Sequence, residues 1–267
     1  MRSTLGLVAI ALLSFPILLM LIVTQQGASY LGTVVNVLNI VLALCAALGC
    51  WFAYKMTGKC FHDEKKGWFF VALAFFLFTV GELLWAVFEL VWGENVPIGS
   101  LADLFWTLGY FALIFGFYVF LSMMFFSSES YNYVIMALSA LIGGFFAYLG
   151  IPVAVAAGEL TLGSFAQHFY VFLDFILLGM VLVLIIPLWR VRNRLFVTWF
   201  IFSLGIAGWI VFDFLFAGMT AFGVYYSGHP VDILYAFAYV LFVFAADSKL
   251  KLVEHKVCLP VKVSKYA

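Results

Sequence analysis

Carboxyl side chains inside apolar segments are the residues of this sequence with the most chemistry to offer. Six of the 13 acidic residues fall within or at the ends of long apolar runs, and they are Glu82, Glu89, Asp103, Asp174, Asp213 and Asp232. An ionised carboxyl group at the centre of a bilayer costs at least about 2.5–3.5 kcal/mol, so such groups usually face a polar interior and mark function. No Lys or Arg lies inside these runs to neutralise them, and Arg194 stands only at the end of one of them. They must therefore be protonated, hydrogen-bonded by hydroxyl and amide groups, or paired with a bound cation.

The acids recur at matching places in the two halves of the chain. Two spacings occur once in each half, fourteen residues from a tryptophan to an acid and seven residues from an aspartate to a tyrosine. The pairs are Trp68 and Glu82, Trp199 and Asp213, Asp103 and Tyr110, and Asp232 and Tyr239. We interpret this pattern as a duplicated four-helix unit, with residues 1–126 and 127–247 as the two repeats and 248–267 as a short basic tail.

Composition sets the class of the elements that carry these acids. The chain is 67% hydrophobic and only 10% charged, which is too apolar for a water-soluble protein of 267 residues. Apolar runs long enough to cross a bilayer lie near 5–24, 30–54, 67–92, 100–126, 132–157, 164–189, 194–218 and 229–247. The prediction is an all-α, polytopic membrane helical bundle with eight transmembrane helices, because hydrocarbon offers no partner for free backbone amides.

Basic residues predict the orientation of the bundle. All 13 Lys and Arg fall in the terminal segments and in the 55–66 and 190–194 loops, which are on one side if there are eight spans. The positive-inside rule then places both termini in the cytoplasm, with the protein in the plasma membrane. A cleaved signal peptide at 5–24 is the less favoured alternative, because the apolar run is long, contains Pro16 and is not followed by an A-x-A site.

The depth of the acids along the predicted helices indicates a site that opens outward. Glu82 and Glu89 are seven residues apart with Trp85 between them, so the three share one helical face. Tyr110 and Tyr239 lie seven residues below the aspartates on their helices and could form the floor. The predicted ligand-binding set is therefore Glu82, Trp85, Glu89, Asp103, Tyr110, Asp174, Asp213, Asp232 and Tyr239.

Structural roles compete with ligand binding for every acid in the set. Ser100 followed three residues later by Asp103 is a capping-box pattern, and Pro230 with Asp232 is typical of the start of a helix. Capping is thus the expected main role of both aspartates. The other acids within helices could instead form interhelical hydrogen bonds that hold the bundle together.

Metal ligands and cofactor motifs are sparse. His168 and His229 map to the outer level with the acids, and a tetrahedral N/S set could form at the inner side from Cys60, His62, His255 and Cys258. Unrelated cytoplasmic residues are the simpler interpretation of this inner group. No Gly-rich phosphate loop, nucleophile elbow, H-E-x-x-H or retinal-binding lysine is present, so we name no cofactor and expect no nucleic-acid partner.

Three stretches carry a family resemblance, namely GELLWAVFEL, PIGSLADLFWTLGY and HFYVFLDFILL. Together they resemble the multi-helix membrane sensor module that precedes diguanylate cyclase or histidine kinase domains in bacteria and archaea. The resemblance implies perception of an extracellular or membrane-borne cue, with Glu82, Glu89, Asp103, Tyr110 and Asp174 at the family's polar positions. Only about twenty residues follow the last predicted span, so we expect the module to stand alone and to signal through a cytoplasmic partner.

Three functions are consistent with these residues. The first is a non-enzymatic, ligand-sensing membrane protein whose outward-facing acidic pocket takes a small cationic or polar ligand. The second is a cation- or proton-coupled small-molecule transporter, in which the two repeats rock around paired acids. The third is an intramembrane metalloenzyme that uses His168, His229 and nearby aspartates to hold a metal that activates water.

Overall fold

Eight long α-helices and one π-helical turn make up nearly all of the described chain. The computed structural model describes residues 2–24, 30–57, 62–93, 100–124, 130–156, 162–191 and 194–254. The elements are α1 (Arg2–Thr24), α2 (Leu31–Thr57), α3 (His62–Val87), the π-helical turn η1 (Phe88–Trp92), α4 (Leu101–Met124), α5 (Ser130–Ala156), α6 (Leu162–Val191), α7 (Arg194–Ala221) and α8 (Asp232–Glu254).

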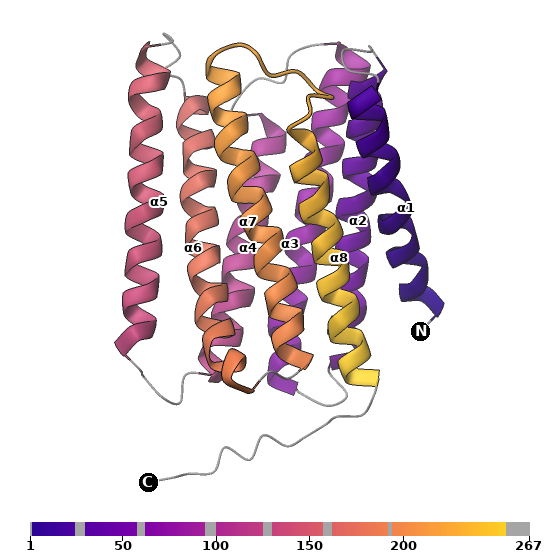
Figure 1. The fold of residues 1–267 in the computed structure, drawn as a ribbon, viewed down its shortest axis with the longest axis vertical. Coiled ribbons are helices and arrows are strands. Elements are labelled where there is room, and N and C mark those ends of the chain that lie inside the picture. Colours follow the sequence, from indigo (N-terminus) through magenta and orange to yellow (C-terminus); the bar gives the residue numbers. More distant parts are fainter. Residues whose placement is uncertain are drawn as a thin grey trace.

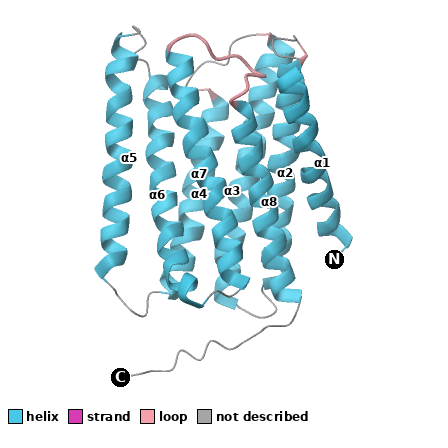
Figure 2. Cartoon of the chain, in the orientation of Figure 1, coloured by secondary structure: helices cyan, strands magenta, loops and turns pink. Residues whose placement is uncertain are grey.

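The helices confirm the predicted class, an integral membrane bundle with eight candidate spans. Each helix is long and apolar enough to cross a bilayer, and the described residues contain no strand (Figure 2). Helices are the expected form of such segments because every interior backbone amide finds its acceptor within the same helix. The large apolar side chains that remain exposed on α1 and α5, such as Leu13 and Leu141, suit contact with lipid.

Six of the helices form a closed ring, and two lie outside it. Around the ring α2 contacts α3, α3 contacts α4, α4 contacts α6, α6 contacts α7, α7 contacts α8, and α8 returns to α2. The helix α1 packs on α2 and α8, whereas α5 packs on α6 and α7 at the far side of the bundle (Figure 1). The two peripheral helices therefore do not line the interior of the ring.

The two ends of the bundle differ in charge. Successive helices alternate in direction, so α1 begins and α8 finishes at the same end (Figure 1). We call this the basic end, because the described Lys and Arg residues belong to it. The opposite end, which carries the 222–231 loop, is called the outer end. The segments 3–54, 67–189 and 195–248 contain no Lys or Arg at all.

The last helix is longer than the predicted span. It was expected to end near residue 247, with Lys249 and Lys251 in a tail, but α8 runs on to Glu254. Lys249 is only 1% exposed and pairs with Glu64 of α3, so this lysine is part of the bundle. Glu64 in turn accepts a hydrogen bond from Trp68 Nε1 at 3.3 Å. An ion pair thus fastens α3 to α8 at the basic end.

Aromatic rings fill the centre of the ring of helices below its midpoint. Trp68 of α3 stacks on Trp199 of α7 with their centroids 5.7 Å apart, and Phe75 packs on Phe202 and Phe242 at 6.2 and 4.9 Å. All five side chains are buried. The basic half of the bundle is therefore a closely packed aromatic core.

The proposed duplication remains a prediction, and several contacts agree with it. If α1–α4 correspond to α5–α8, the ring contacts occur in equivalent pairs, such as α2 with α3 and α6 with α7. Trp68 and Trp199 hold matching positions in the two halves and touch each other, as residues close to a two-fold axis would. The peripheral helices depart from the symmetry, because α1 packs on α2 and α8 whereas α5 packs on α6 and α7.

Candidate functional site

A cavity of about 770 Å³ occupies the outer half of the ring. Its wall is drawn from α2, α3, η1, α4, α6, α7, the 222–231 loop and α8. The lining residues are Val35, Asn36, Asn39, Phe78, Glu82, Trp85, Glu89, Asp103, Trp106, Tyr110, Tyr170, Trp209, Phe212, Asp213, Phe216, Thr220, Gly223, Tyr225, Tyr226, Ser227, Asp232 and Tyr235. The volume lies within the range of pockets that hold small organic ligands.

The structure gathers the predicted ligand-binding residues around this one cavity. Seven of the nine line it directly, and they are Glu82, Trp85, Glu89, Asp103, Tyr110, Asp213 and Asp232. The other two, Asp174 and Tyr239, lie behind the wall, where each is hydrogen-bonded to a residue that does line it. Whether the set binds a ligand stays a prediction.

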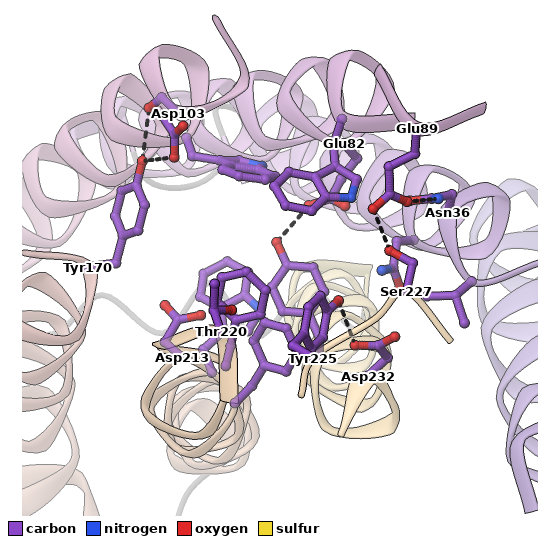
Figure 3. A pocket seen from close by; sticks show the side chains of 18 of the residues that line it. Asn36, Glu82, Glu89, Asp103, Tyr170, Asp213, Thr220, Tyr225, Ser227 and Asp232 are labelled. Atoms are coloured by element: carbon purple, nitrogen blue, oxygen red, sulfur yellow. Dashed lines mark hydrogen bonds between the residues drawn. The ribbon is translucent and has the colours of Figure 1, made fainter. Parts of the chain in front are cut away.

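Asp103 holds the start of α4 against α6. Its Oδ2 atom accepts hydrogen bonds from the Ser100 backbone N–H at 2.9 Å and from the Ser100 hydroxyl at 3.1 Å, which confirms the predicted cap. Its Oδ1 atom accepts a third bond from the Tyr170 hydroxyl at 3.1 Å, visible at one side of the cavity in Figure 3. Asp103 therefore fixes one rim of the cavity.

Asp232 holds the start of α8 against the 222–231 loop. It is the first residue of α8, and its Oδ2 atom accepts the Gly228 N–H at 2.8 Å while Oδ1 accepts the Tyr225 hydroxyl at 3.1 Å. Gly228 has φ of 93°, and a Cβ atom there would lie 2.8 Å from Leu31 Cβ, so only glycine fits between the loop and α2. Burial, reinforced by the Asp232 carboxylate, raises the pKa of Tyr225 well above its usual range.

Glu89 connects α2, η1 and the 222–231 loop. Its Oε2 atom accepts a hydrogen bond from Asn36 Nδ2 and its Oε1 atom accepts one from the Ser227 hydroxyl, both at 2.7 Å (Figure 3). The carboxyl group sits in η1, which widens the end of α3 before Gly93 terminates it at φ of 65°. Such π-helical turns are frequent at functional sites because they redirect a side chain.

Glu82 lies deeper, on the side of the cavity where α3 faces α8. Its Oε1 atom accepts hydrogen bonds from the Tyr235 hydroxyl at 2.6 Å and the Tyr239 hydroxyl at 3.2 Å. The indole N–H of Trp106 approaches this carboxyl group but does not reach hydrogen-bonding geometry. Two tyrosines thus orient Glu82 toward the cavity.

Asp213 is the counterpart of Glu82 on the opposite side of the cavity, where α7 meets α4 and α6. The Tyr110 hydroxyl lies 3.2 Å from Asp213 Oδ2 and 2.7 Å from Asp174 Oδ1, so one tyrosine bridges two carboxyl groups. Asp174 is fully buried and lies within hydrogen-bonding reach of Asp213. Asp213 itself is half-buried and reaches the cavity.

The two deep acids are held in a reciprocal way. Tyr110 from the first half of the chain donates to Asp213 in the second half, and Tyr239 from the second half donates to Glu82 in the first. Both distances are 3.2 Å. All four residues belong to the spacings that recur in the two halves of the sequence. Each half of the chain thus contributes one acid and one tyrosine to the contact between the halves.

Several buried polar atoms in the wall have no hydrogen-bond partner among the described residues. In the cavity lining they are Asn39 Oδ1, Trp106 Nε1, Trp209 Nε1 and Thr220 Oγ1. A buried polar group without a partner costs about 1–3 kcal/mol, so native proteins rarely leave four of them around one space. Water or a ligand in the cavity would satisfy both the two donors and the two acceptors.

The metal-ligand predictions gain no support from the part of the chain that the structure describes, which holds no group of three His, Cys, Asp or Glu placed to bind a metal. His229 lies in the 222–231 loop, where its Nδ1 atom accepts the Val231 N–H at 3.2 Å. The remaining candidates fall outside the described side chains, and they are His168, Cys60, His62, His255 and Cys258.

Sequence reasoning missed the polar and aromatic residues that complete the cavity. Asn36, Asn39 and Thr220 could have been found, because amide and hydroxyl side chains within apolar spans usually have a packing or binding role. Trp106, Tyr170, Trp209 and Tyr235 could not, because aromatic residues make up 20% of the chain and most of them serve packing.

Comparisons of the chain with known protein families, with curated proteins and with solved structures gave no match.

Proposed function

We propose that this integral membrane protein senses a small cationic or polar ligand, which binds in the outer cavity and alters the basic end of the bundle. The basic end then faces the cytoplasm of a plasma-membrane protein, where a signalling partner docks. The observation that carries the proposal is one cavity of about 770 Å³ lined by five carboxyl groups and by four buried polar atoms without protein partners. The resemblance to the membrane sensor modules that precede cyclase or kinase domains agrees with this function.

The route from the cavity to the basic end runs along α8. This helix carries Asp232, Tyr235 and Tyr239 at the cavity and Lys249 at its far end. A ligand that moves the tyrosines would shift a rigid helix whose other end is fastened to α3 by the ion pair with Glu64. Packed helices pass on such shifts because their interfaces hold few discrete arrangements.

The closed basic half favours sensing over conduction. Below Phe78 and Trp209, which meet at 5.0 Å, the centre of the ring is filled by buried aromatic rings down to Trp68 and Trp199. The buried acids of the cavity have no polar continuation through this packing among the described residues. For a ligand that enters from the outer end, this aromatic packing therefore closes the cavity toward the basic end.

The reciprocal acid and tyrosine contacts favour a transporter as the second candidate. Tyr110 with Asp213, and Tyr239 with Glu82, join the two halves of the chain at the cavity, which is where coupling ions bind in transporters that rock one repeat against the other. Movement of the halves would have to open the aromatic core toward the basic end. Ligand uptake into liposomes separates the two functions, because a sensor gives none.

Thermal unfolding of the detergent-purified protein tests whether the cavity binds a ligand. The wild type, Glu82→Gln and Asp213→Asn are compared across a panel of inorganic cations, amines and neutral polar compounds, with Asp247→Asn as a control at the basic end. We expect a ligand to raise Tm in the wild type and the control but not in the cavity variants. Equal shifts in all four proteins, or none in any, would contradict the proposal.

Sensing is tested separately from binding. Spin labels at the basic ends of α3 and α8, placed at exposed Lys66 and Lys251, report the distance between these helices with and without the ligand that raises Tm. We expect the distance distribution to change on binding. An unchanged distribution at saturating ligand would leave a binding protein that does not signal along α8.

A further inference from the structure

The five carboxyl groups of the cavity fall into two sets according to how their oxygens are satisfied. In Glu89, Asp103 and Asp232 both oxygens accept a hydrogen bond from the protein. The donors join the ends of helices and the 222–231 loop. These three acids are therefore structural, and they have little left to offer a ligand.

Glu82 and Asp213 form the second set. Both tyrosine hydroxyls at Glu82 donate to Oε1, and the tyrosine at Asp213 donates to Oδ2. No tyrosine or other hydroxyl group donates to Glu82 Oε2 or Asp213 Oδ1, and the nearest further groups among the described residues are the Trp106 indole N–H beside Glu82 and the Asp174 carboxyl group beside Asp213. Each deep acid thus presents one oxygen that accepts no hydrogen bond from a tyrosine.

The charges around the cavity also indicate a cationic ligand. Asp174 behind Asp213 brings the acids around the cavity to six, and the segments 3–54, 67–189 and 195–248 that form its walls contain no Lys or Arg. Carboxylates in a membrane interior need a cation or a proton nearby. A cationic group bound between Glu82 and Asp213 would supply both the missing charge and the missing hydrogen-bond donors.

The rest of the wall selects an organic cation. Half of the lining residues are aromatic, and they include the tryptophans Trp85, Trp106 and Trp209. Trp85 and Trp106 lie side by side with centroids 5.5 Å apart, and Phe216 faces Trp85 at 6.3 Å. Aromatic faces attract ammonium groups and pack against apolar bodies, whereas a hydrated metal ion prefers an oxygen-lined site.

We infer that the ligand of this cavity is a protonated organic amine, whose N–H groups donate to Glu82 Oε2 and Asp213 Oδ1 and whose apolar body lies against the tryptophans. The inference rests on the proposed function and specifies its ligand class. Asn39, 7% exposed, offers a further acceptor for an amine in Oδ1, and Trp209, 2% exposed, offers an N–H to an acceptor on the ligand body. These side chains point to a ligand independently of the acids.

Three matched probes separate charge from hydrogen bonding. Phenethylamine carries a protonated amine, its N,N,N-trimethyl counterpart keeps the charge without N–H donors, and phenethyl alcohol has no charge. Binding to the full-length protein in detergent is measured by calorimetry near neutral pH. We expect the amine to bind about tenfold or more tightly than either analogue, since a hydrogen bond to a charged group contributes about 1.5–3 kcal/mol.

Single-residue variants test where in the cavity the amine binds. Asp213→Asn and Glu82→Gln should each weaken amine binding about tenfold or more, whereas Asp247→Asn, at the basic end, should leave it within about threefold. Asp213→Glu keeps the carboxyl group and should retain part of the affinity. Comparing Tm of all variants without ligand shows whether any loss of binding comes from misfolding.

Different results overturn different claims. Alcohol or quaternary probes that bind as tightly as the amine, or an amine whose affinity ignores both deep acids, would overturn the amine assignment while leaving a ligand-binding cavity. Failure of all three probes to bind would also overturn it. Amine binding without any change between α3 and α8 would instead overturn sensing and leave the amine site in place.

Discussion

Two regions of this bundle bury carboxyl groups and treat them in opposite ways. At the basic end Glu64 is paired with Lys249, a lysine that is itself almost completely buried. In the outer cavity Glu82 and Asp213 have tyrosine hydroxyls as partners and no Lys or Arg within the segments that surround them. A lysine thus neutralises the acid at the basic end, whereas the segments around the outer cavity contain no basic side chain for Glu82 and Asp213.

The comparison distinguishes a carboxyl group whose charge is paired within the protein from carboxyl groups that have no basic partner there. A buried charge is tolerated when its partner is fixed, and removing that partner leaves an uncompensated charge that destabilises the fold. Glu64 meets this condition. Glu82 and Asp213 do not meet it, because no Lys or Arg lies in the segments that surround them. Substitutions at the two ends should therefore behave differently, which the following predictions test in order of decreasing effect.

Removal of Lys249 should have the largest effect. Lys249→Met removes the buried cation that pairs with the partly buried Glu64 carboxylate, which is expected to cost about 3–5 kcal/mol in the free energy of unfolding. Thermal or chemical unfolding in detergent measures the loss. Lys251→Met is the control, because Lys251 is 66% exposed in its pair with Asp247 and should cost no more than about 0.5 kcal/mol.

A double variant shows whether the effect of Lys249→Met comes from charge. Glu64→Gln combined with Lys249→Met removes both charges and should recover much of the stability that the single variant loses. A double variant as unstable as Lys249→Met alone would mean that packing of the lysine stem, not its charge, holds the basic end.

The next largest effect on the free energy of unfolding is expected where the helices pack densely below the cavity. A Cβ atom at Gly205 of α7 would lie 2.5 Å from the Phe242 ring of α8, whereas one at Gly144 of α5 meets nothing within 4 Å. Gly205→Ala should therefore destabilise the protein by about 1–3 kcal/mol. Gly144→Ala should be neutral or stabilising by up to about 1 kcal/mol, because alanine favours the helix. Equal effects on unfolding would contradict the packed basic half.

The rim of the cavity should show a smaller effect. Tyr225→Phe removes the hydroxyl that donates to Asp232, with an expected loss of about 0.5–1.5 kcal/mol. Because burial holds the pKa of Tyr225 above its usual range, its contribution is present below about pH 10 and is lost as the pH rises further. The variant should therefore lose less stability than the wild type on going from neutral to alkaline pH. Parallel pH curves would show that the hydroxyl bond contributes nothing.

The sequence predicted the fold because each span carries its own signal. A run of about 20 apolar residues is a helix in a bilayer whatever its neighbours are, so eight spans could be counted without knowing how they pack. The basic residues predict a boundary between the last span and the tail at residue 247, whereas α8 continues to Glu254 and includes Lys249 and Lys251. Their position depends on Glu64, which is 185 residues away in the sequence, and no local pattern reveals that pair.

The cavity could be predicted in part for a related reason. Acids are rare in apolar spans, so Glu82 and Asp213 stand out from the sequence alone, and the matched spacings single out Tyr110 and Tyr239. The contacts of Glu82 with Tyr239 and of Asp213 with Tyr110 come only from the structure. Which oxygens have donors depends on helix rotation, which periodicity does not fix. The sequence thus separates Asp103 and Asp232, which lie at helix starts, from the acids inside the helices, but it does not show that Glu89 is held by hydrogen bonds to both of its oxygens.

Asp213→Asn should have the smallest effect on the ligand-free protein. The substitution keeps the size of the side chain and an acceptor for the Tyr110 hydroxyl, and it removes a carboxyl group that lies close to Asp174 with no Lys or Arg nearby. Loss of an uncompensated charge offsets loss of a charged hydrogen bond, so stability should change by no more than about 1 kcal/mol. Glu64→Gln, measured in parallel by unfolding in detergent, should cost clearly more because it removes the carboxylate that pairs with buried Lys249. If Asp213→Asn were as destabilising as Glu64→Gln, Asp213 would have to be counted with the structural acids, and the outer cavity would lose one of the two oxygens on which an amine site depends.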